Sequence, residues 1–277
     1  MFEKMKIRYF ALSAVALFLI LAILYGVFIG KPSEMDPVSD VIFQYIMLGI
    51  FPLVWFGLQF KKQKQPISSV VTTKRIKPYI KDIIILVPTL LFFTYGAYWL
   101  TAFALHGLFP NYVKEFLADD MDLPANKVIY ILTVLNGCVV GPVAEEFMFR
   151  GLLTKRLGTK TTILWGTILS SFIFSVFHSD ILGSFVFGFI LSIVFLKTNN
   201  LAVTSLVHIL SNSIILVMPY TPKFIDIWTI SDLYKQMVPN IICLVITTSI
   251  LLAYAWKNWY VFRFNQKAQV NQIEKGI

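Results

Sequence analysis

The sequence contains few charged residues: they make up 14% of its 277 residues, whereas 57% are hydrophobic. A soluble domain of this length needs more polar surface, because about a quarter of the residues in soluble domains are charged. The scarcity of charge therefore excludes an ordinary soluble protein. Several apolar runs exceed the roughly 18 residues that mark a membrane-spanning helix, so the pattern predicts an all-α, polytopic membrane protein.

A disulfide framework is also lacking, because the chain has only two cysteines. Cys138 and Cys243 fall in different apolar segments, where buried thiols pack as small hydrophobic side chains. No internal repeat, low-complexity segment or soluble second domain is visible. We therefore expect a single integral membrane domain over residues 1–277, with a polar core at about 128–218 and the lipid bilayer as its surroundings.

Eight apolar segments are expected to be membrane helices. The first of them is too long for the apolar core of a signal peptide, so we expect it to be retained. The turn "HSDI" between the fifth and sixth segments is short, and the sixth segment itself is short. The eight predicted spans are approximately 9–30, 38–60, 83–105, 128–153, 161–178, 181–196, 201–218 and 240–262.

The basic residues predict the orientation of these helices. An even number of spans puts both ends of the chain on one side, and 19 of the 24 Lys and Arg residues then fall on that side. Cytoplasmic loops carry such an excess, so the sequence predicts that both ends are inside. The net charge of +9 is therefore no sign of nucleic-acid binding. The short loops are typical of a bacterial protein, and we expect the plasma membrane as its location.

Three charged residues lie inside the fourth apolar segment: Glu145, Glu146 and Arg150. An ionisable group in mid-membrane costs about 2.5–3.5 kcal/mol and normally faces a partner or a cavity. Glu146 and Arg150 are four residues apart, so they share a helix face and are predicted to form an ion pair. Pairing leaves Glu145 unexplained. A carboxylate in a poorly solvated cavity is a usable general base near neutral pH.

Two histidines and an asparagine also lie in apolar segments. His178 ends the fifth segment, and His208 and Asn212 share one face of the seventh. Together with the three charged residues they are nearly all the strongly polar side chains of the central membrane region. Because polar groups on membrane helices face inward, we expect them to converge on one cavity near mid-membrane that opens laterally or outward.

This set of residues is suited to hydrolysis of a peptide bond by water. A carboxylate and an imidazole can orient and deprotonate the water, while a second imidazole and a carboxamide stabilise the oxyanion. Alternatively, Glu145, His178 and His208 could hold a zinc ion that activates its bound water. The sequence lacks a GxSG motif, an HExxH helix and an aspartate pair within the spans. These absences argue against serine, HExxH-type and aspartyl mechanisms.

The motifs resemble those of a known family. "EEFMFR" reads as EExxxR, "FSVFH" as FxxxH and "HILSN" as HxxxN. In this order on membrane segments, they resemble the CAAX-protease and bacteriocin-processing family of intramembrane proteases, which includes the type II CAAX prenyl endopeptidases and Abi-type proteins. The resemblance implies a membrane endopeptidase in which Glu145 and His178 activate water, His208 and Asn212 stabilise the oxyanion, and Glu146 and Arg150 support the helix. It implies a peptide or membrane-protein substrate and leaves open whether zinc takes part.

Two other classes of function remain open on the sequence. Buried Glu, His and Arg residues also line ion paths, but a transporter predicts two related halves with discontinuous helices, and no such repeat is visible. A non-catalytic scaffold or bacteriocin-immunity protein could keep the same fold. The complete set of motif residues favours the endopeptidase over both alternatives.

Overall fold

The computed structural model describes residues 1–30, 36–117, 126–217, 227 and 229–263, and every regular element among them is a helix. All eight predicted segments are helical, which confirms the all-α fold. They are α1 (Ile7–Phe28), the continuous run of α2 (Pro37–Gln44), η3 (Tyr45–Ile50) and α3 (Phe51–Lys62), α4 (Ile80–Leu105), the run of α6 (Lys127–Leu135), η7 (Asn136–Val140), α7 (Gly141–Glu145), η8 (Glu146–Thr154) and α8 (Lys155–Lys160), then α9 (Ile163–Val176), α10 (Ile181–Thr198), α11 (Leu201–Val217) and α13 (Met237–Lys257).

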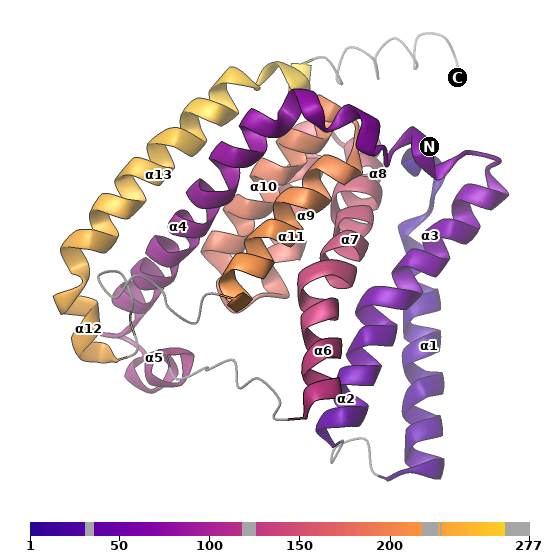
Figure 1. Cartoon of the computed structure of the whole chain (residues 1–277), viewed down its shortest axis with the longest axis horizontal. Helices are drawn as coiled ribbons and strands as arrows, with labels where there is room; N and C mark the ends of the chain where they lie inside the picture. Colours follow the sequence, from indigo (N-terminus) through magenta and orange to yellow (C-terminus); the bar gives the residue numbers. More distant parts are fainter. Residues whose placement is uncertain (31–35, 118–125, 218–226, 228, 264–277) are drawn as a thin grey trace.

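Six of these helical stretches are long and apolar enough to cross a membrane, and α9 and α11 are the shorter two. With 14 residues, α9 is about 21 Å long, less than the roughly 30 Å of a hydrocarbon core, and the described part of α11 has 17 residues. The turn from α9 to α10 consequently lies well short of the lower ends of α1 and α6 in Figure 1. The apolar helices expected at both places are present, and α9 is shorter than the segment predicted at 161–178.

The first and last described helices place their outer ends on one side of the molecule. The start of α1 and the end of α13 both lie at the top of Figure 1, together with the junction between α8 and α9. At the opposite side, two short helices that the sequence did not predict, α5 (Pro110–Leu117) and α12 (Ile230–Lys235), pack beside the end of α4. This arrangement is the one expected for an even number of transmembrane segments.

Prolines explain two places where the long helices widen into π-helical turns. Pro142 has no N–H to donate and its ring would clash with the carbonyl one turn earlier. The preceding residue, Gly141, accordingly bonds five residues back to the carbonyl of Asn136. Phe51 bonds in the same way to Ile46, immediately before Pro52. Each proline thus leaves the helix continuous but changes which side chains share a face.

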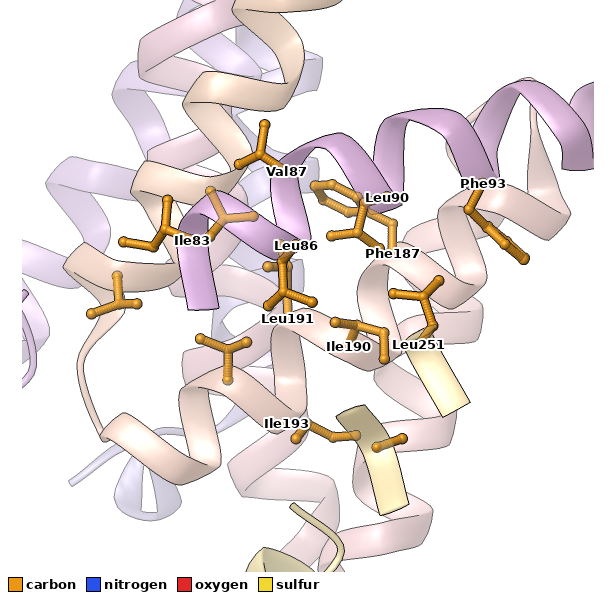
Figure 2. Close-up of a cluster of buried hydrophobic side chains, with 14 of the residues drawn as sticks. Ile83, Leu86, Val87, Leu90, Phe93, Phe187, Ile190, Leu191, Ile193 and Leu251 are labelled. Atoms are coloured by element: carbon orange, nitrogen blue, oxygen red, sulfur yellow. The ribbon is translucent and has the colours of Figure 1, made fainter. Parts of the chain in front are cut away.

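The main hydrophobic core lies between α4, α10 and α13. Side chains of α4, such as Leu86 and Leu90, meet Phe187 and Leu191 of α10, with Leu251 of α13 beside them (Figure 2). Leu86 and Leu191 are fully buried. This core forms the wall behind α9 and α11, the two short helices that carry the motif histidines.

The segment between α3 and α4 fixes the start of α11. Asn200 accepts a hydrogen bond from the backbone N–H of Thr72 at 3.0 Å and donates one to its carbonyl at 2.8 Å. The backbone N–H of Leu201 donates to the carbonyl of Val70 at 2.6 Å. The same Asn200 oxygen also accepts from Ala202 in the first turn of α11. These bonds set the position of α11 along its axis, and with it the height of His208.

We expect Gly166→Ala to destabilise the protein, because α8 and α9 touch through their backbones at this residue. A Cβ atom at Gly166 would lie 2.4 Å from the nitrogen of Gly158 and 2.6 Å from the carbonyl oxygen of Thr154, and neither backbone atom can rotate away. Overpacking of this kind typically costs about 1–3 kcal/mol. Thermal unfolding in detergent measures the loss. Gly57→Ala is the matched control, because no atom lies within 4 Å of the added Cβ there; equal unfolding temperatures for the two variants would contradict the close contact.

Candidate active site

The EExxxR motif lies where the fourth long helix changes from α to π geometry. Glu145 ends α7 and Glu146 begins the π-helical segment η8. Such π turns are rare and occur frequently at functional sites. The neighbouring α9 supports this segment, because the hydroxyl of Ser170 donates to the carbonyl of Phe149 at 2.7 Å. In a regular α-helix, as the sequence predicted, the side chains of the EExxxR motif would point in directions different from those observed.

The predicted ion pair between Glu146 and Arg150 is present. Nη1 of Arg150 lies 3.2 Å from Oε1 of Glu146, and both side chains are buried, at 1% and 0% exposure. The guanidinium also lies 4.4 Å from the ring centre of Phe174. Arg150 therefore stays in the interior as the counter-charge of Glu146 and does not reach toward the aqueous side.

His208 contacts both glutamates of the motif. Its Nδ1 lies 2.9 Å from Oε1 of Glu146, and its Nε2 lies 3.6 Å from Oε2 of Glu145. A carboxylate paired with Arg150 can only accept, so the Nδ1–H of His208 is the donor. In a neutral imidazole the Nε2 atom then carries a lone pair. In that tautomer, the ring nitrogen that faces Glu145 is an acceptor, and the side chain of Glu145 is 23% exposed.

Phe174, the first residue of the FxxxH motif, holds the histidines in place. Its ring centre lies 4.3 Å from that of His178 and 6.0 Å from that of His208. The carbonyl of Phe174 accepts a hydrogen bond from Nδ1 of His178 at 2.8 Å. Nδ1 of His178 is therefore also a donor, and its Nε2 is the free atom. The motif pattern contained this phenylalanine, but sequence alone gave it no role.

Three of the predicted site residues line one cavity of about 480 Å³: His178, His208 and Asn212. The walls of this cavity come from α4, η7, α11 and the turn between α9 and α10. One N–H of Asn212 is engaged by the carbonyl of Gly137 at 2.8 Å, and its second N–H remains. Glu145 is not among the residues that line the cavity. It contacts one of them, His208.

The cavity has polar lining residues that the sequence analysis did not single out. Asp180 and Ser184 belong to the start of α10, and Ser211 lies on α11 one residue before Asn212. Asp180 caps α10 by accepting from the N–H of Gly183 at 3.0 Å. The only available signal was the acidic residue in the turn "HSDI", which patterns of hydrophobicity treat as an ordinary loop residue.

The described residues do not fit a zinc site. No three His, Cys, Asp or Glu side chains within the described ranges are arranged so that they could hold one metal ion. Of the suggested ligands, His178 and His208 each keep an Nε2 atom available, but Glu145 does not line the cavity that both histidines line. We therefore derive no chemical step through a metal.

Removal of Arg150 tests its function as counter-charge. Arg150→Met is expected to lower folded abundance strongly, because breaking a buried ion pair from one side costs about 3–5 kcal/mol. Adding Glu146→Leu removes the orphaned charge and should restore part of the abundance without restoring function. Detergent-solubilised, size-exclusion-pure protein is the readout, with exposed Arg75→Met as control. A single variant with normal abundance would contradict the buried pair.

The comparisons with known proteins agree with the motifs. The model of the family described as type II CAAX prenyl endopeptidase Rce1-like matches residues 127–214, the region that contains all three motifs. A Bacillus subtilis protein described as "Putative membrane peptidase YdiL" is 27% identical over 94 residues, which are 33% of this chain and 38% of that protein. The alignment thus spans less than half of the relative. No solved structure matches the chain.

Motifs, helical architecture and family match coincide in the same third of the sequence. Residues 127–214 contain α6 to α11, including the Glu146–Arg150 pair and both motif histidines. The description of the Bacillus subtilis protein as a putative membrane peptidase agrees with the apolar helices observed here. Through this region, the chain resembles the type II CAAX prenyl endopeptidases, and its apolar helices make it an integral membrane protein.

Proposed function

We propose that the protein is an intramembrane endopeptidase in which Glu145 and His208 activate the attacking water. The observation that carries this proposal is the position of Nε2 of His208, 3.6 Å from Oε2 of Glu145. Two groups that both accept hydrogen bonds face each other there. A water molecule can donate one proton to each, which orients its oxygen for attack and makes its deprotonation easier.

The neighbouring charges support Glu145 as the base. Arg150 is within ion-pair distance of Glu146, so Glu146 carries the neutralised charge of the motif. Glu145 has His208 as its neighbour instead of a cation. Glu145 is therefore the carboxylate of the motif that is left to accept a proton from water. The division of labour between adjacent glutamates therefore follows from which of them Arg150 faces.

The proposed reaction adds the water oxygen to the carbonyl carbon of the scissile peptide bond while Glu145 takes the proton. The negative charge that forms on the carbonyl oxygen needs a donor. In its present tautomer His208 offers none, so the remaining N–H of Asn212 is the better candidate. Collapse of the intermediate breaks the C–N bond, and Glu145 returns its proton to the leaving amine. Nε2 of His178, free on the cavity side, can assist this transfer.

Glu145→Gln tests the base directly. Glutamine keeps the size of the side chain but cannot take a proton, and loss of a general base typically lowers the rate about 10²–10⁴-fold. Abundance should be unchanged, because Glu145 does not balance Arg150. The measurement is quantitative peptidomics of membrane and medium fractions from cells with the wild-type or variant protein.

The control for this experiment is Glu115→Gln, which changes an exposed glutamate of α5. Peptides that depend on Glu145 but not on Glu115 would identify products and their cleavage positions. An identical peptide pattern in wild type and Glu145→Gln would contradict the peptidase and favour a scaffold with the same fold.

We further propose that the substrate reaches the cavity from the outer half of a bacterial plasma membrane, as a secreted peptide precursor or a membrane protein. The cavity lies at the ends of α9 and α11 that point away from the start of α1. The excess of basic residues supports an inside location for the start of α1. Cleavage of prenylated cytoplasmic proteins would require the opposite access.

Cysteine accessibility tests this orientation. Single cysteines replace exposed Ser179, beside the cavity, or exposed Thr159, at the opposite side, in a background without Cys138 and Cys243. Intact cells treated with an impermeant maleimide should label position 179 and leave position 159 unlabelled. Labelling at 159 alone would reverse the orientation and make the cavity face the cytoplasm.

A further inference from the structure

Asp180 is a buried carboxylate in the cavity wall that the proposed reaction does not use. It is 7% exposed and lies in the turn before α10. Its Oδ1 atom accepts the hydrogen bond that caps this helix, from the N–H of Gly183 at 3.0 Å. Its Oδ2 atom is buried without a hydrogen-bond partner among the described residues. Helix capping therefore accounts for one oxygen and leaves the other unexplained.

The residue that Asp180 caps is shaped to admit the second oxygen. A Cβ atom at Gly183 would lie only 1.8 Å from Oδ2 of Asp180, well inside any possible contact. Any side chain at position 183 would thus push the carboxylate aside. A glycine in a helix is less favourable than alanine by about 1 kcal/mol. Gly183 therefore leaves room for the carboxylate at the expense of helix stability.

The described lining of the cavity offers no basic side chain to Asp180. No lysine or arginine is among the described residues that line it, and Asp180 is the one carboxylate among them. Arg150 cannot serve as counter-ion, because it is paired with Glu146. A buried carboxylate without a partner is strongly unfavourable. A positively charged group on a molecule that enters the cavity would remove this penalty.

We propose that Asp180 forms a subsite for a cationic nitrogen of the peptide that the cavity binds: a lysine or arginine side chain, or a free N-terminus. Ser184 lines the cavity next to it, and its hydroxyl oxygen can accept a further N–H group of an ammonium ion. The subsite lies two residues from His178, so it selects peptides with positive charge near the scissile bond. That the bound peptide is a substrate rests on the proposed peptidase function. That Asp180 binds a cation does not depend on this function.

Occupancy of the cavity provides a test that needs no cleavage. The reporter is the full chain with Glu145→Gln, in which Cys138 and Cys243 are replaced and Ser179 is changed to cysteine. The measured quantity is the alkylation rate of this cysteine in detergent micelles. Three short apolar peptides compete: one with an acetylated N-terminus and a central lysine, one acetylated with norleucine instead, and one with norleucine and a free N-terminus. The lysine peptide should protect the cysteine at a concentration at least about tenfold lower than acetylated norleucine, because hydrogen bonds to a charged group in a poorly solvated site are strong.

The two norleucine peptides distinguish the sources of the cation. If the peptide with the free N-terminus protects as well as the lysine peptide, the subsite recognises an amine generally. If it protects no better than its acetylated counterpart, the subsite recognises a basic side chain. Both results support a cation site and differ only in which part of the substrate supplies the charge.

Asp180→Asn is the decisive variant, because asparagine caps helices as well as aspartate does but has no charge. It should abolish the preference for lysine while leaving the fold intact. Gly183→Ala should do the same by displacing the carboxylate. Asp36→Asn is the matched control: Asp36 caps α2 through the N–H groups of Val38 and Ser39, but it is exposed.

Equal protection by all three peptides would overturn the subsite, and so would a preference for a cationic peptide that survives in Asp180→Asn. Neither result depends on catalysis, because the reporter lacks the proposed base. Absence of any peptide product dependent on Glu145 would instead contradict the peptidase and leave the occupancy result standing. The two proposals therefore fail separately.

Discussion

The organisation of the site depends on the buried charge of Glu146. A fully buried carboxylate needs a counter-charge, and Arg150 supplies it at 3.2 Å. Because this pairing keeps Glu146 ionised, the carboxylate accepts the Nδ1–H of His208 and fixes its tautomer. The free Nε2 then points to Glu145. The Glu146–Arg150 ion pair thus determines which ring nitrogen of His208 donates to Glu146 and which one faces Glu145.

The packing around η8 holds this pair through backbone contacts more than through long side chains. Gly151, directly after Arg150, lies so close to the ring of Phe2 that a Cβ atom there would be 2.7 Å from it. On the other side, Ser170 bonds to the backbone of η8. Phe174 covers the guanidinium of Arg150. Because these neighbours contact the backbone or fill a defined space, they fix the position of η8, which carries both charges, relative to His208 on α11.

The helical class, the eight segments and the Glu146–Arg150 pair could be predicted from the sequence, because apolar length and four-residue spacing are local properties. The π geometry could not, although Pro142 marked the place, since many prolines only kink a helix. The contact between His208 and Glu145 was missed for the same reason: it depends on how α11 is set against η8. Asp180 was not predicted as a cavity residue, because an aspartate that caps a helix and an aspartate that lines a cavity look the same in the sequence.

At a helix end inside a membrane protein, the free backbone N–H and C=O groups need hydrogen-bond partners other than water. Irregular backbone is tolerated there only where it is buried in protein or lines a cavity. At the end of α9, Nδ1 of His178 donates to the carbonyl of Phe174, a group of the last turn. At the start of α10, Oδ1 of Asp180 accepts the N–H of Gly183. Each cap uses one polar atom of its side chain and leaves a second one in a residue that lines the cavity. The break between two short helices therefore produces both the cavity and two oriented polar groups in its wall.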